Sequence, residues 1–174
     1  CAAYSGAALY AAPFGKLSLN DSARLDGNVG EYRGGGMYVS NSAEFHVSDG
    51  AAIINNVCAG QGGGIFAEAA MGHVMDKALI ANNSANAGGG IAAIASSTLY
   101  VTGAARVDDN LCSGEGAGIS LEESTLYLHD SASVSGNRAT GYGGGLRLQN
   151  FAVATLEDSA TVLRNQASYG AGCA

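Results

Sequence analysis

Apolar residues recur at a nearly fixed distance along the chain, and most follow a short cluster of glycine and alanine. The spacings between successive members are 28, 28, 26, 28, 27 and 27 residues. The members are Leu9, Met37, Ile65, Ile91, Ile119, Leu146 and Cys173. A fixed period of this size predicts a repeat protein in which residues one period apart occupy equivalent places.

Three short strands are predicted in each repeat from alternation of apolar and polar positions. One strand begins at the recurring apolar residue. A second shows clear alternation at 17–19, 45–47, 99–101 and 126–128 and weaker alternation at 73–75 and 154–156, so His73 is expected to face inward. The third carries the pattern A-x-[VIL]-x-x-N and ends each time at an asparagine.

A 27-residue unit with three short strands cannot bury its own apolar side, so the units must stack, strand on parallel strand, about 4.8 Å apart. Crossover connections between parallel strands are right-handed. The expected fold is therefore all-β: a right-handed parallel β-helix of about six coils of 26–28 residues, with three short strands per coil. The period does not suit a leucine-rich repeat or a propeller blade. Residues 1–174 are expected to form a single segment of a larger protein, because both ends fall inside a repeat.

Two kinds of residue recur in fixed columns once the repeats are aligned. A glycine stands three residues before each apolar residue, which indicates a turn with positive φ or a close backbone approach. The glycines are Gly6, Gly34, Gly62, Gly88, Gly116, Gly143 and Gly170. The asparagines are expected to form a structural ladder, each amide donating to the next, rather than a ligand site. They are Asn28, Asn56, Asn83, Asn110, Asn137 and Asn165.

An acidic column accompanies the asparagines, two residues before the alanine of the third strand. It contains Asp21, Asp49, Asp76, Asp130 and Asp158, with Gly103 in the remaining coil. Aspartate caps backbone N–H groups in tight turns, and this role is favoured over Ca²⁺ binding because no G-G-x-G-x-D nonapeptide occurs.

Composition agrees with a turn-rich β-protein: 27 residues are glycine and one is proline. A net charge of −7 disfavours nucleic acid and anionic lipid as partners. The uncharged stretch 78–105 contains several asparagines, serines and threonines, so no membrane span is expected in this segment.

The cysteines and histidines offer no recognisable metal motif. Cys1, Cys58 and Cys112 are expected about two coils, or about 9.6 Å, apart, whereas a disulfide needs Cα atoms closer than about 7 Å. Buried thiols are expected, with pairing to a partner chain as the alternative. No H-x-x-x-H or C-x-x-C spacing indicates zinc, and His46 and His129 are expected to point outward. No metal and no cofactor is therefore predicted.

Aromatic residues form two short outward stripes. Tyr10, Tyr38 and Phe66 follow the recurring apolar residue in three successive coils, and Tyr100 and Tyr127 lie on the second strand. The first stripe is a candidate surface for binding glycans or a partner, although stabilisation of neighbouring strands is the favoured interpretation. The outward positions of that strand carry no paired carboxylates, so no catalytic residue is assigned and the chain is not expected to be an enzyme.

The repeat resembles that of the chlamydial polymorphic outer membrane proteins, which carry G-G-A-[ILV] and F-x-x-N. The glycine halves here include Gly62-Gly-Gly-Ile65 and Gly88-Gly-Gly-Ile91, and the asparagine halves include Ile80 to Asn83. Glycine usually replaces the alanine, and valine, isoleucine or leucine replaces the phenylalanine. The resemblance implies a non-enzymatic structural segment of a large extracellular or cell-surface protein: an adhesin, a stalk or a filament building block. Its partners would be other chains or adjoining coils, stacked end to end, and glycans. The alternative is a carbohydrate-binding or polysaccharide-active β-helix domain.

Overall fold

The computed structural model describes residues 2–5 and 8–173, which contain 24 strands and no helix. The strands form four six-stranded sheets, and every strand pair is parallel. Sheet A contains β1 (Ala2–Ser5), β5 (Val29–Arg33), β9 (Val57–Cys58), β13 (Ser84–Ala87), β17 (Leu111–Glu115) and β21 (Arg138–Ala139). Sheet B contains β2 (Leu9–Ala11), β6 (Met37–Ser40), β10 (Ile65–Glu68), β14 (Ile91–Ile94), β18 (Ile119–Glu122) and β22 (Leu146–Gln149). Sheet C contains β3 (Lys16–Leu19), β7 (Glu44–Val47), β11 (Met71–Val74), β15 (Thr98–Val101), β19 (Thr125–Leu128) and β23 (Val153–Leu156). Sheet D contains β4 (Arg24–Asp26), β8 (Ala52–Ile54), β12 (Leu79–Ala81), β16 (Arg106–Asp108), β20 (Ser133–Ser135) and β24 (Thr161–Leu163).

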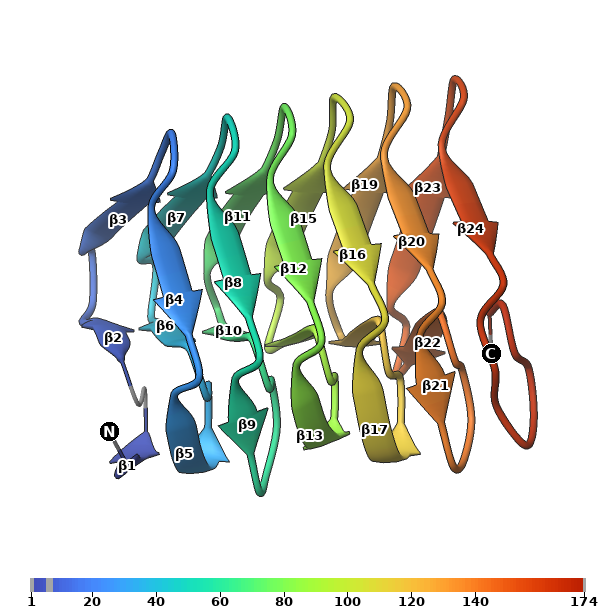
Figure 1. Ribbon diagram of the computed structural model, residues 1–174, viewed down its shortest axis with the longest axis horizontal. Coiled ribbons are helices and arrows are strands. Elements are labelled where there is room, and N and C mark those ends of the chain that lie inside the picture. The colour runs from blue at the N-terminus through green and yellow to red at the C-terminus, as the bar shows by residue number, and fades with distance from the viewer. Residues whose placement is uncertain (1, 6–7, 174) are drawn as a thin grey trace.

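The chain is a β-solenoid of six coils, each of which contributes one strand to every sheet. In Figure 1 the chain descends along sheet D on the near side, returns upward along sheet C on the far side and advances from left to right, which makes the coil right-handed. The predicted parallel β-helix and its number of coils are thus confirmed.

Each coil has four strands, so the prediction of three was wrong. The missed strand is that of sheet A, which follows the column asparagine. Its inward positions hold small residues such as Gly30, Cys58 and Ala85, while Val57 and Leu111 point outward and are exposed. The alternation of large apolar and polar residues that reveals a strand is therefore absent there.

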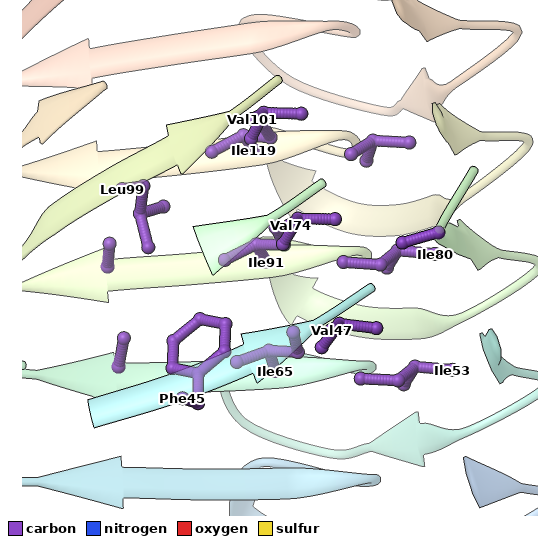
Figure 2. Packing of buried hydrophobic residues seen from close by; sticks show 14 of the residues in the cluster. Phe45, Val47, Ile53, Ile65, Val74, Ile80, Ile91, Leu99, Val101 and Ile119 are labelled. Carbon is purple, nitrogen blue, oxygen red and sulfur yellow. The ribbon is translucent and has the colours of Figure 1, made fainter. Parts of the chain in front are cut away.

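The core fills the space between sheets B, C and D with columns of like residues. Ile65, Ile91 and Ile119 are register partners on sheet B, and Val74 and Val101 are partners on sheet C. All five are buried, and Figure 2 shows the repetition from coil to coil. Because equivalent residues face each other at the strand spacing, each coil buries its apolar side against the coils above and below.

One departure from the columns explains a wrong prediction. The strand β11 places Gly72 and Val74 inward, one residue out of register with the predicted 73–75 alternation. A Cβ atom at Gly72 would lie 2.2 Å from Cζ of Phe45, because that ring fills the space that a side chain on this coil would take. Figure 2 shows Phe45 and Leu99 on the same side of the core. His73 consequently faces outward, and the prediction of an inward histidine was wrong.

Candidate functional site

The six column asparagines lie in one row at the corner between sheets D and A. In each link, both the backbone N–H and the side-chain amide of one asparagine donate to Oδ1 of the next, at 2.9–3.0 Å. The second amide hydrogen reaches the preceding coil; that of Asn110, for example, donates to the carbonyl of Ile80 at 3.0 Å. Asn56, Asn83, Asn110 and Asn137 are completely buried. Both donors and both acceptor positions of an interior amide are thus used inside the protein.

The glycine clusters are required by the backbone geometry of the next corner. The first glycine of each described cluster, from Gly34 to Gly170, has φ between 57° and 69°, whereas Gly6 lies outside the described residues. The third glycine leaves no room for a side chain: a Cβ at Gly90 would lie 2.6 Å from the carbonyl oxygen of Gly118 and 2.9 Å from Nδ2 of Asn110. The glycine column therefore lets the coils approach and keeps the asparagines in place.

The acidic column occupies the tight turn between sheets C and D. Its aspartates have φ of 57–60°, and Gly103 has φ of 69° at the equivalent position. Aspartate is one of the few residues that tolerate this conformation. The carboxylate also reaches the neighbouring turn, since Asp130 accepts a hydrogen bond from the backbone N–H of Gly103 at 2.8 Å. Asp76 and Asp158 accept in the same way from the backbone N–H groups of Asp49 and Asp130, so these three aspartates cap the neighbouring turn.

The candidate stripe of Tyr10, Tyr38 and Phe66 is mostly covered. Its rings lie in one column, with centroids 5.1 and 5.3 Å apart, but Phe66 is fully buried and Tyr38 is 9% exposed. The guanidinium of Arg33 lies 5.0 Å from the centroid of Phe66. Only Tyr10 is exposed. The three rings therefore do not share an open face, contrary to the expectation from the sequence.

Arg33 belongs to a polar cluster beside this stripe. It donates to Glu68 at 2.7 Å and to the hydroxyl of Tyr38 at 3.1 Å, and Tyr38 donates to Glu68 at 2.5 Å. Burial, followed by the hydrogen bond to Glu68, raises the pKa of Tyr38 above its usual value. Arg33 and Tyr38 thus both donate to Oε2 of Glu68.

Two carboxylates, those of Glu115 and Glu122, lie farther along the same side, in a surface depression of about 350 Å³ lined mainly by residues of sheets A and B. Glu115 accepts from Nε of Arg147 at 2.5 Å, and Glu122 accepts from the amide of Asn150 at 2.9 Å. Each carboxylate is thus held by a neighbour from an adjacent coil.

The outer face of sheet C carries a longer aromatic column than the sequence indicated. His46, His73, Tyr100 and Tyr127 stack in order with centroids 4.7, 4.9 and 5.1 Å apart and interplanar angles of 7–11°. Sequence alternation found the two tyrosines, but the register error at His73 hid the connection to His46. Since each ring covers its neighbour's face, an interior ring offers solvent only its edge.

Glu44 lies next to the two histidines on this face. Its Oε1 is 2.7 Å from Nε2 of His46, and its Oε2 is 2.7 Å from Nζ of Lys16. Ligand atoms of Glu44, His46 and His73 all lie within 4.8 Å of one another. Burial, followed by the charge of His46, lowers the pKa of His73. Glu44 and His46 form an E-x-H pair on one strand, and this signal becomes informative only when His73 is placed beside it.

The three cysteines in the described part of the chain form no disulfide. Cys58, Cys112 and Cys173 are free thiols, and Cys1 lies outside the described residues. Cys58 and Cys112 are buried on the inner side of sheet A, separated by the strand that carries Ala85. Burial raises the pKa of Cys112 to about 11.

A short serine ladder was missed by sequence reasoning. Ser97 accepts from the backbone N–H of Ala70, and Ser124 accepts from that of Ser97, each at 3.1 Å. The two serines stand two residues before Leu99 and Leu126, and this equivalence was the available signal.

The chain matches no protein-family model, no curated protein and no solved structure. Within the described ranges, no helix is long and apolar enough to cross a membrane.

Proposed function

We propose that the chain is a non-enzymatic structural segment whose function is to form a rigid stack of coils. The asparagine ladder is the observation that carries this proposal, because it runs through all six coils and uses its polar groups internally. In addition, every buried side-chain nitrogen and oxygen in the described part of the chain has a hydrogen-bond partner. The strongest recurring polar residues are thus explained by the stability of the stack.

The proposed setting is a large extracellular or cell-surface protein, as an adhesin, a stalk or a building block of a filament. Support comes from the resemblance of the glycine and asparagine motifs to the chlamydial polymorphic outer membrane protein repeat. A stack of six coils at the usual strand spacing extends about 30 Å along its axis. Adjoining coils or other chains, added end to end, would extend it further through the same parallel pairing.

Carbohydrate binding or cleavage is the alternative function, and two features disfavour it. A sugar ring binds best on an open aromatic face, whereas the rings on sheet C cover one another and Phe66 is buried. Glycoside hydrolysis requires a pair of carboxylates available to the substrate, whereas Glu68 and Glu115 are engaged by arginines.

Two measurements test the proposal. Incubation with acidic and neutral polysaccharides, combined with a glycan array, is expected to give neither cleavage nor saturable binding; turnover of any polysaccharide would refute the non-enzymatic function. Antibodies raised against the folded chain should label intact cells of the source organism and decorate rods or fibres in electron micrographs. Labelling only after permeabilisation would refute the proposed location.

A further inference from the structure

We propose that Glu44, His46 and His73 form a binding site for a divalent transition-metal ion, with Zn²⁺ as the expected occupant. The site would lie on the outer face of sheet C and join two successive coils. This inference is independent of the proposed structural function, since it concerns three side chains that the ladder does not use.

The strand register brings the three side chains together. Glu44 and His46 are two residues apart on β7, so both point to the same outer face. His73 on β11 is the register partner of His46, and their ring centroids are 4.7 Å apart. A parallel ladder therefore holds two imidazoles and one carboxylate within reach of one point.

The distances suit a metal after a small adjustment. Zn²⁺ bonds nitrogen and oxygen at about 2.0–2.1 Å, so the donors around a tetrahedral ion are about 3.3 Å apart. The ligand atoms of this cluster lie within 4.8 Å of one another. Rotation of the imidazoles about χ2, a broad torsion, brings the nitrogens closer without moving the backbone. All three side chains are half-buried, so an ion would be partly screened from solvent yet accessible.

The chemistry of the donors also fits. Two imidazoles and one carboxylate are a common set of three protein ligands for zinc, with water in the fourth position. Glu44 can supply Oε1 to the metal while Oε2 keeps its ion pair with Lys16, because the two contacts use different oxygens. Both histidines must be neutral to bind a metal ion, so binding should weaken as the pH falls below the histidine range.

The combination of two histidines and one glutamate occurs at one place among the described positions of these two columns. Along the column that contains His46 and His73, the other coils carry Ser18, Tyr100, Tyr127 and Thr155. The neighbouring column carries Lys16, Met71, Thr98, Thr125 and Val153 around Glu44. Among these described positions, the two imidazoles and the carboxylate coincide in the second and third coils.

The test uses the tag-free chain after treatment with a chelator. Calorimetric titration with ZnCl₂ is expected to show one ion per chain, and Co²⁺ is expected to give the visible absorption bands of a tetrahedral site. His73→Tyr removes one ligand but keeps the ring stack, since tyrosine occupies this position in the next two coils. This variant and Glu44→Gln are expected to weaken binding at least about tenfold. His129→Gln is the matched control and should bind like the parent chain.

The absence of saturable 1:1 binding by the parent chain, or equal affinity in His73→Tyr, would overturn the proposal. Circular dichroism without metal establishes that each variant is folded. If a variant does not fold, the ring ¹⁵N resonances of the parent chain decide the matter: those of His46 and His73 should shift on addition of Zn²⁺ while those of His129 stay in place. A shift of His129 alone would refute the assignment.

Discussion

Replacement of Asn110 by alanine should destabilise the protein far more than a comparable change at the end of the ladder. Oδ1 of Asn110 accepts from the backbone N–H and the side-chain amide of Asn83, at 2.9 and 3.0 Å. Both residues are fully buried, so Asn110→Ala leaves two donors without an acceptor and without water. Each buried unsatisfied donor costs about 1–3 kcal/mol, which gives a loss of about 2–6 kcal/mol. That is a large part of the 5–15 kcal/mol typical of a folded domain.

Asn28→Ala is the matched control because it removes the same atoms at the first position of the ladder. The amide of Asn28 donates to Oδ1 of Asn56 at 2.9 Å, and that oxygen keeps a second bond, at 3.0 Å, from the backbone N–H of residue 28. No interior donor loses its acceptor, so the expected cost is that of one hydrogen bond, about 0.5–1.5 kcal/mol.

Equilibrium unfolding in urea, followed by far-ultraviolet circular dichroism, measures both losses by linear extrapolation. The account predicts that Asn110→Ala loses at least about 1 kcal/mol more than Asn28→Ala. Equal losses in the two variants would refute the claim that the interior amides are fully committed to one another.

Three further predictions concern the glycine column, the thiols and pH. Gly90→Ala should destabilise the protein by about 1–3 kcal/mol in the same assay, because the added methyl group overlaps the next coil. Gly172→Ala is the control and should be neutral, since nothing lies within 4 Å of the added atom. Equal effects of the two substitutions would contradict the role of the glycine column. Cys58 and Cys112 are buried with raised pKa, so mass spectrometry should find them unmodified by iodoacetamide at pH 8 until denaturant is added; rapid labelling of either residue in the folded protein would contradict their placement. The pKa of Tyr38 is raised in the fold, so its contribution to stability is complete below the unfolded-state pKa of about 10 and is lost as pH rises through the folded-state value. Tyr38→Phe should therefore show a smaller loss of stability above pH 10 than the parent chain, and identical profiles would refute this assignment.

The sequence predicted those parts of the fold in which the same residue type occupies the equivalent position in every coil. Asn83 and Asn110 are equivalent in sequence and stacked in space, and their shared column was sufficient to infer the parallel coil. The glycine at position 34 and its equivalents predicted a corner because positive φ restricts the choice of residue.

The strands of sheet A were not predicted because their inward positions hold only small residues. Gly30, Cys58 and Ala85 leave little hydrophobic alternation, and the sheet packs closely against the glycine-rich corner instead of the main core. Local sequence patterns do not report such packing.

The grouping of Glu44, His46 and His73 was not predicted, for a different reason. Glu44 and His46 are close in sequence, but His73 joins them only through the register of two strands. The 27-residue spacing of His46 and His73 agrees with this register, but glycine at position 72 removes the apolar alternation from that strand, and the Phe45 ring occupies the space of the absent side chain. The burial of Tyr38 and Phe66 in the candidate aromatic stripe was not foreseen, because Arg33, which lies over the Phe66 ring, comes from the unpredicted sheet.

The most direct test of the central claim is nuclear magnetic resonance of protein labelled with ¹⁵N in asparagine only. The account predicts nuclear Overhauser cross-peaks that link the side-chain amides in order from Asn28 through Asn56, Asn83, Asn110 and Asn137 to Asn165. The four interior amides should also exchange slowly with solvent. Rapid exchange of those four, or the absence of cross-peaks between successive members, would contradict it.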